Sequence, residues 1–131
     1  MIEWKEEYRL GIDSIDEQHQ KLFEIAGRAY KLLKNENYVD KYDRIVAILD
    51  ELKEYTIYHF NSEEEYMKSI NYKKILSHKV QHDDFIEKVS NVDFDHVDAN
   101  QDRYITETLD FILNWIQDHI LGTDKLYTAG K

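Results

Sequence analysis

The sequence contains no cysteine and no proline, and only four of its 131 residues are glycine. Without cysteine, the chain can form no disulfide, no thiolate metal site and no thiol nucleophile. Without proline and with so little glycine, it has few positions at which a helix must break. Together these absences favour an all-helical protein built from long elements.

Positive charge and long apolar runs are also scarce. The chain has 17 Lys and Arg against 27 Asp and Glu, which gives a formal net charge of -10 at pH 7. Nucleic acids and anionic membranes are bound through Lys and Arg, so we expect neither as a partner. No apolar run approaches the length of a membrane span, and the acidic N-terminus lacks the order of a signal peptide. We therefore expect a soluble, cytoplasmic protein.

Apolar residues recur at helical spacing in four segments. An ordered N-terminal arm at 1–15 is expected to precede helices at about 16–36, 41–69, 73–90 and 101–121. Asp13 or Ser14 is the expected cap of the first helix, and Asp40 that of the second. Short polar connections join the segments. This pattern predicts a single domain, residues 1–131, folded as an up-down-up-down four-helix bundle.

The histidines follow the apolar stripes of these predicted helices. Five of the six lie on stripes that are otherwise mostly aliphatic and aromatic: His19, His59, His78, His82 and His119. One histidine on such a stripe is usually a core residue with a hydrogen-bond partner, but five together need many partners for their ring nitrogens. A shared metal centre would satisfy all of them. His96 lies in an acidic connection and is expected to be solvated.

A carboxylate accompanies one of these histidines. Glu63 follows His59 by four residues, so both side chains lie on one face of a helix. A buried carboxylate is costly unless it is paired or binds a metal, which strengthens the case for a metal site. Glu64 and Glu65 point in other directions on a helix, and we expect both to be solvated.

A second carboxylate near the C-terminus has a less direct spacing. Asp124 follows His119 by five residues, which is about 140° around a regular α-helix. On a straight helix it would therefore point away from the histidine. If the helix ended or loosened near Gly122, the carboxylate would turn inward and join the predicted metal site.

The complete pattern resembles the hemerythrin family in its single-domain bacterial form. The matching motifs are Asp16-Glu17-Gln18-His19, His59-x-x-x-Glu63, His78-x-x-x-His82 and His119-x-x-x-x-Asp124. Arm and core residues also occupy family-like positions, among them Trp4, Tyr8, Phe60 and Trp115. The resemblance extends from Trp4 to about Tyr127, and all seven ligand positions are filled.

The resemblance implies a non-haem di-iron centre. One iron would bind His78, His82 and His119, the other would bind His19 and His59, and the bridges would be Glu63, Asp124 and an oxo or hydroxo group. If both irons are octahedral, these ligands fill every position on the first iron. They leave one position open on the second, where a small molecule can bind.

In this family the small molecule is O2, so the resemblance implies reversible oxygen binding for storage, transport or delivery, without enzymatic turnover. Candidates for an apolar lining that keeps water from the gas are Phe23, Phe60, Trp115 and Ile116. Ordinary core packing explains each of these four side chains equally well. Two alternatives stay open: an enzyme acting on peroxide or nitric oxide, and a sensor of O2 or iron. The sequence identifies no recipient for the oxygen.

Overall fold

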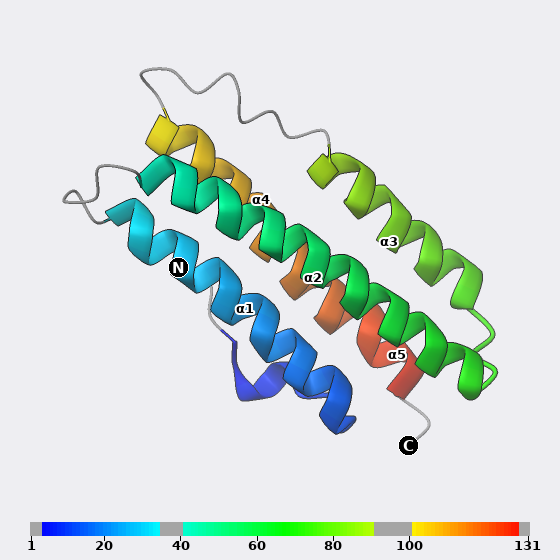
Figure 1. The fold of residues 1–131 in the computed structure, drawn as a ribbon. Coiled ribbons are helices and arrows are strands. Elements are labelled where there is room, and N and C mark those ends of the chain that lie inside the picture. The colour runs from blue at the N-terminus through cyan, green and yellow to red at the C-terminus, as the bar shows by residue number, and fades with distance from the viewer. Residues whose placement is uncertain (1–3, 35–40, 91–100, 129–131) are drawn as a thin grey trace.

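Four long helices form an antiparallel bundle in the computed structural model, which describes residues 4–34, 41–90 and 101–128. The helices are α1 (Asp13–Lys34), α2 (Lys41–Ser69), α3 (Ile75–Ser90) and α4 (Gln101–His119). Consecutive helices run in opposite directions (Figure 1), and the described residues contain no strand. The predicted all-α, up-down-up-down bundle is confirmed.

Three short elements lie near one end of the bundle. A 3-10 turn, η1 (Glu6–Tyr8), belongs to the N-terminal arm. A π-helical turn, η2 (Ile120–Asp124), follows α4 directly and leads into α5 (Lys125–Thr128). Figure 1 shows the arm and α5 at the end of the bundle where α1 begins and α2 meets α3.

Helix α1 begins earlier than the sequence pattern predicted. Asp13 is its first residue, so neither Asp13 nor Ser14 caps it from outside the helix. The carboxylate of Asp16 instead accepts hydrogen bonds from the backbone N–H groups of Leu10 (2.8 Å) and Gly11 (3.1 Å). Gly11 has φ +88°, a conformation that glycine adopts without a steric cost. Asp16 thereby fixes the arm to the helix. The predicted cap Asp40 and the predicted solvated His96 lie outside the described residues.

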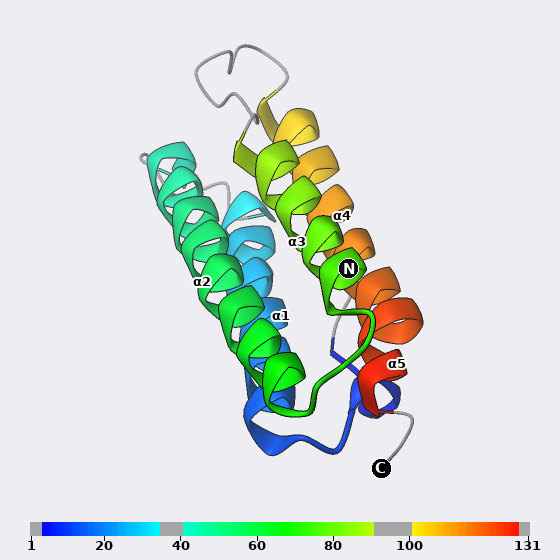
Figure 2. The same ribbon diagram turned by 90° about the vertical axis from the view of Figure 1, so that its right-hand side faces the viewer.

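The apolar stripes meet in the centre of the bundle. Helix α1 packs against α2 and α4, and α2 packs against α3, an arrangement seen from the side in Figure 2. Helices α3 and α4 meet through the stacked rings of Phe85 and Trp115, whose centroids are 4.1 Å apart. One face of α2 is buried along its length by residues three or four apart: Ile45, Leu49, Leu52, Thr56, His59, Glu63 and Met67. Each fully buried Leu or Ile contributes about 1.5–3 kcal/mol to stability.

The ordered N-terminal arm covers apolar surface of the bundle. Tyr8 is only 1% exposed, and its ring stacks on Phe23 of α1 at a centroid distance of 5.5 Å. Its hydroxyl donates a hydrogen bond to Oε1 of Gln117 on α4 (3.2 Å). The arm thus joins α1 to α4 at the end of the bundle where the histidines lie.

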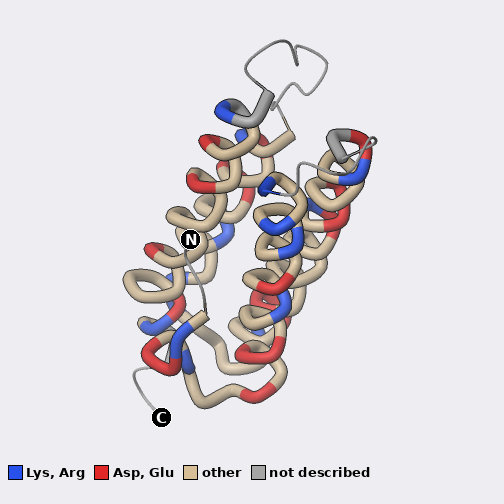
Figure 3. Tube along the Cα trace, turned by 90° about the vertical axis from the view of Figure 1, so that its left-hand side faces the viewer, with Lys and Arg blue, Asp and Glu red and all other residues tan. Residues whose placement is uncertain are grey.

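Positive and negative residues are interspersed along the helices (Figure 3). Among the described residues, the buried histidines and the buried acidic residues other than Asp16 are instead concentrated at one place, described below. Among the described helices, none has the length and apolar character required to cross a membrane.

Candidate metal centre

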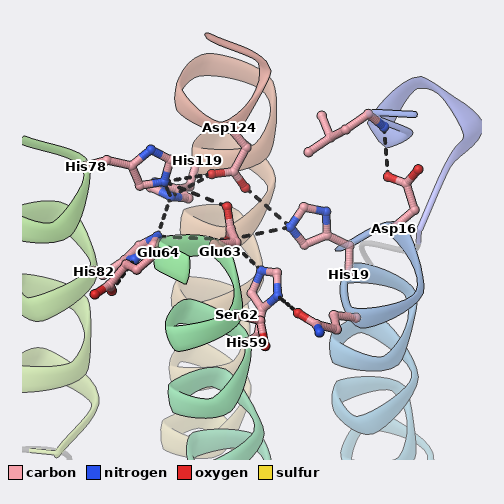
Figure 4. A network of polar contacts seen from close by, with 12 residues as sticks. Asp16, His19, His59, Ser62, Glu63, Glu64, His78, His82, His119 and Asp124 are labelled. Carbon is pink, nitrogen blue, oxygen red and sulfur yellow. Dashed lines mark hydrogen bonds and ion pairs between the residues drawn. The ribbon is translucent and has the colours of Figure 1, made fainter. Parts of the chain in front are cut away.

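The seven side chains predicted to bind metal meet at one end of the bundle (Figure 4). All of them are at most 5% exposed. They form two overlapping groups whose ligand atoms lie within 4.8 Å of one another: Glu63, His78, His82, His119 and Asp124, and His19, His59, Glu63 and Asp124. Both carboxylates belong to both groups. This division is the one that the resemblance implied.

Asp124 reaches the centre because the chain forms a π-turn after His119. In η2, the N–H of Lys125 donates to the carbonyl of Ile120, five residues earlier. Such hydrogen bonding brings residues five apart onto nearly the same face, so His119 and Asp124 point the same way. The helix therefore loosens near Gly122 and continues into α5. A helix end at this position, which was the other expectation, is not what the structure shows.

The Asp124 carboxylate lies between histidines of both groups. Its Oδ1 is 3.0 Å from Nε2 of His78 and 3.0 Å from Nε2 of His119. Its Oδ2 is 3.3 Å from Nε2 of His19. One oxygen therefore faces the three-histidine group and the other faces the two-histidine group, as a bridging carboxylate requires.

Glu63 is placed in a similar way by α2. Its Oε1 is 2.6 Å from Nε2 of His59 and 3.8 Å from Nε2 of His19, while its Oε2 is 3.8 Å from Nε2 of His78. Oε1 is also 4.0 Å from Nε2 of His82. The helical spacing of His59 and Glu63 therefore produces the contact that it predicted, and the carboxylate extends from there toward the second group.

Three imidazole nitrogens converge on one point. Nε2 of His119 is 2.9 Å from Nε2 of His78 and 3.1 Å from Nε2 of His82. A neutral imidazole has only one N–H, so three such nitrogens cannot all be satisfied by one another. Two nitrogens bound at about 2.1 Å to one metal, at a right angle, would lie about 3 Å apart. The observed spacing fits a metal ion held by these three rings.

The outer nitrogens of three site histidines are bound by acceptors from neighbouring helices. In each case Nδ1 of the histidine is the donor. His59 donates to Oε1 of Gln18 (2.7 Å), His82 donates to Oε2 of Glu64 (3.0 Å), and His119 donates to Oε1 of Gln81 (3.1 Å). With the proton on Nδ1, each ring presents the lone pair of Nε2 to the centre. These contacts select the tautomer that binds a metal.

Each of the three acceptors lies on the helix that precedes, in the chain, the helix of its histidine. Gln18 of α1 binds a histidine of α2, Glu64 of α2 binds one of α3, and Gln81 of α3 binds one of α4. Each acceptor is the sequence neighbour of a predicted ligand, and one residue corresponds to about 100° around a helix. When the ligand points to the centre, its neighbour can point toward the adjacent helix.

Sequence reasoning missed these acceptors and was wrong about one of them. Glu64 was expected to be solvated, but its side chain is only 20% exposed and binds His82. Glu65 is exposed, as expected. One sequence criterion could have identified Gln18, Glu64 and Gln81 as candidates: each is adjacent to a predicted ligand and can accept a hydrogen bond. The same criterion also selects other polar residues.

The protonation states at the centre suit metal binding. Burial lowers the pKa of His82 to about 3 and also lowers the pKa of His59. Burial and Asp124 would raise the pKa of Glu63, but the nearby imidazoles, His59 foremost, lower it to about 2. The pKa of Asp124 lies well below its usual value, because His119 and other imidazoles outweigh the effect of burial. Ionised carboxylates and neutral imidazoles are the forms that bind metals.

His19 and Asp124 contain buried polar atoms that the protein does not satisfy by hydrogen bonds. Among the described residues, the carboxylate oxygens of Asp124 and Nε2 of His19 lie within ion-pair distance of their neighbours but without hydrogen-bond geometry, and Nδ1 of His19 has no hydrogen-bond partner. Burial lowers the pKa of His19, but the carboxylates of Asp124 and Glu63 raise it to about 9. An unsatisfied buried polar group costs about 1–3 kcal/mol. Cations at the centre would satisfy Nε2 of His19 and the carboxylate oxygens of Asp124, and would displace the proton from that nitrogen.

The four candidate lining residues lie in different surroundings. Phe60 stacks on His82 with a centroid distance of 3.8 Å, and Trp115 stacks on His119 at 4.5 Å. Ile116 is buried on α4, whereas Phe23 is buried against Tyr8 of the arm. Phe60 and Trp115 thus shield histidines of the three-histidine group. A gas-pocket lining made by any of the four stays a prediction.

Comparison with known proteins agrees with this geometry. Residues 10–129 match the model of the hemerythrin HHE cation binding domain. The chain belongs to the hemerythrin family. The hemerythrin match covers all seven clustered side chains, so the family's cation-binding function and the geometry of this centre support each other.

Relatives in this family align along most of their length. A bacteriohemerythrin of Clostridium acetobutylicum is 55% identical over 97% of this chain and 98% of its own length. A bacteriohemerythrin of Stenotrophomonas maltophilia is 29% identical over 97% of this chain and 79% of its own. A hemerythrin-like protein of Naegleria gruberi is 27% identical over 95% and 88% of the two chains.

Proposed function

We propose that this protein binds O2 reversibly at a di-iron centre, and that its role is the storage, transport or delivery of oxygen in the cytoplasm. The observation that carries the proposal is the unequal division of the histidines. Three histidines belong to one ligand group and two to the other, while both groups share Glu63 and Asp124. If two metals with the same coordination number bind these ligands, the metal with fewer histidines keeps one free coordination position.

The donor set agrees with iron. His78, His82 and His119 would hold one iron, His19 and His59 the other, and both carboxylates would bridge them. Imidazole and carboxylate donors suit iron but also other transition metals, so the family is what favours iron here. When bound, the two irons supply two electrons and one open coordination position to a small ligand.

The surrounding residues favour binding without turnover. Three ligand histidines, His59, His82 and His119, have outer contacts that hold them in one tautomer. The two-histidine group is buried, since His19 and His59 are each 1% exposed. Carboxylate-rich di-iron sites of the ferritin type use Glu and Glu-x-x-His ligands, whereas this centre has five imidazoles and two carboxylates. We therefore include in the proposal that the protein is not an enzyme.

An oxygenation experiment tests the proposal. The protein would be loaded with ferrous iron under anaerobic conditions, titrated with O2, and then returned to an oxygen-free atmosphere. We expect two irons per chain, and an optical spectrum that forms with O2 and disappears when O2 is removed. Irreversible oxidation with no reversible spectrum would overturn the proposal. Turnover of peroxide or nitric oxide beyond one equivalent per site would identify an enzyme instead.

A pair of variants on α2 controls for the site. Glu63→Ala removes a carboxylate that is 0% exposed and shared by both ligand groups. Glu65→Ala removes the same group from an exposed position two residues away. We expect the first variant to lose iron and the optical response, and the second to keep both.

A further inference from the structure

One of the three outer contacts of the site histidines carries a charge. His59 and His119 donate their Nδ1 protons to the neutral amide oxygens of Gln18 and Gln81. His82 donates to the carboxylate of Glu64, with a distance of 3.0 Å between Nδ1 and Oε2. Glutamine and glutamate have the same size and both can accept this hydrogen bond. The negative charge of Glu64 is therefore not needed for the contact with His82 and is a feature in its own right.

The imidazole of His82 is held firmly in this contact. Phe60 stacks on one face of its ring at a centroid distance of 3.8 Å and an interplanar angle of 1°. Its Nε2 points to the three-histidine group, 3.1 Å from Nε2 of His119. Glu64 reaches its outer edge from a surface pocket of about 390 Å³, which Lys79 and Asp83 also line. The partly exposed pocket allows the carboxylate to be solvated while it accepts the hydrogen bond.

A carboxylate affects a metal-bound imidazole more strongly than an amide does. A hydrogen bond to an ionised acceptor is roughly twice as strong as one between neutral groups, and it draws the Nδ1 proton away from the ring. The ring then donates more electron density through Nε2 to its metal. Greater donation stabilises the oxidised, more highly charged state of that metal.

We propose that Glu64 is a positioning residue that lowers the reduction potential of the metal bound by His78, His82 and His119. It acts through His82 and does not contact the metal. The neutral contact of His59 lacks this effect, so the two metals of the centre are made electronically unequal by their outer contacts as well as by their ligands. This inference rests on the proposed iron centre, but it does not require that O2 binding is reversible.

A redox titration of the iron-loaded protein, without O2, tests the inference. Glu64→Gln keeps an acceptor of the same size and removes the charge, and Glu65→Gln removes the same charge from the exposed neighbour. We expect Glu64→Gln to raise the ratio of reduced to oxidised iron at a given applied potential by about tenfold or more. A tenfold rise corresponds to an increase of about 59 mV in the reduction potential for a one-electron couple. Glu65→Gln should leave the ratio unchanged.

A reciprocal variant tests the same effect from the other side. Gln81 accepts hydrogen bonds from Nδ1 of His119 and from the hydroxyl of Thr123, each at 3.1 Å, and glutamate can accept both. We expect Gln81→Glu to shift the potential in the opposite direction. Should Glu64→Gln fail to load iron, Gln81→Glu decides, because it leaves every predicted ligand and the Glu64 contact in place.

The outcomes separate this inference from the proposed function. Equal potentials in wild type, Glu64→Gln and Gln81→Glu would overturn the inference, and so would equal shifts in Glu64→Gln and Glu65→Gln. Wild type that oxidises irreversibly in O2 while the two variants shift in opposite directions would refute only the oxygen-binding role. Reversible oxygenation with unchanged potentials would refute only the role of Glu64.

Discussion

Phe60 is the aromatic residue whose loss should affect both the stability of the bundle and the protection of the centre. Its ring is 4% exposed, stacks on His82 and contacts Phe85 and Trp115 at centroid distances of 6.0 and 5.7 Å. Replacing a buried Phe by Ala costs about 3–5 kcal/mol. For a chain of this length we expect the melting temperature to fall by about 10–20 °C.

The second effect of Phe60→Ala concerns water. Phe60 and His82 together line the surface pocket between α2 and α3, so removing the ring extends that pocket toward the ligand histidines. Water that enters favours irreversible oxidation of a ferrous centre. We expect faster loss of the ferrous state in air, measured optically on the iron-loaded variant, together with the lower melting temperature of the metal-free form.

Phe85→Ala is the matched control. Phe85 is 1% exposed and stacks on Trp115 at 4.1 Å, whereas within the described residues its ring is paired with no histidine ring of the site. It should lower the melting temperature by a similar amount without accelerating oxidation. If both variants oxidise at the same rate, stability alone explains the effect, and the idea that Phe60 protects the centre is refuted.

Three further predictions concern ligands, acidity and the arm. Asp124→Asn should lower the iron content below two per chain, because an amide has one oxygen and cannot bridge two metals. Asp118→Asn, at an exposed position of α4, should leave the iron content unchanged, and metal analysis of both variants checks this. The pKa of His82 falls from 6.5 to about 3 on folding, and that of Glu63 from 4.5 to about 2, so the unfolded chain binds more protons between these values. The metal-free protein should therefore lose stability as the pH drops from about 6.5 to 3, by up to about 1.4 kcal/mol per pH unit for each group. Urea denaturation at several pH values measures the free energy of unfolding, and a free energy that does not change with pH would contradict this prediction. Asp16→Ala removes two hydrogen bonds to arm amides, so both amides should exchange hydrogen faster, while amides at the far end of the bundle stay unchanged.

Much of the fold and of the centre was predictable because it depends on local spacing. Helical periodicity predicted which side chains point inward, and five histidines on those faces already indicated a shared centre. His59 and Glu63 are four residues apart, and the contact between them needs only a regular helix. The absence of proline and the small number of glycines made long helices the expected outcome.

The position of Asp124 could be predicted only in part. From the sequence, five residues of regular α-helix would turn it away from His119, and a loosened helix was one of two ways to bring it back. The π-turn depends on backbone hydrogen bonds such as that between Lys125 and Ile120. Packing of this turn against the rest of the bundle decides whether such bonds form, and no local rule contains that information.

The sequence by itself determined the residue types, their helical faces and therefore the existence of a histidine and carboxylate centre. The tertiary structure decided which groups support that centre from outside. Glu64 and Glu65 are identical, adjacent residues, yet one binds His82 and the other is exposed. The physical reason is that the ligand faces follow from the turn of a single helix, whereas the outer contacts depend on how two helices are placed against each other.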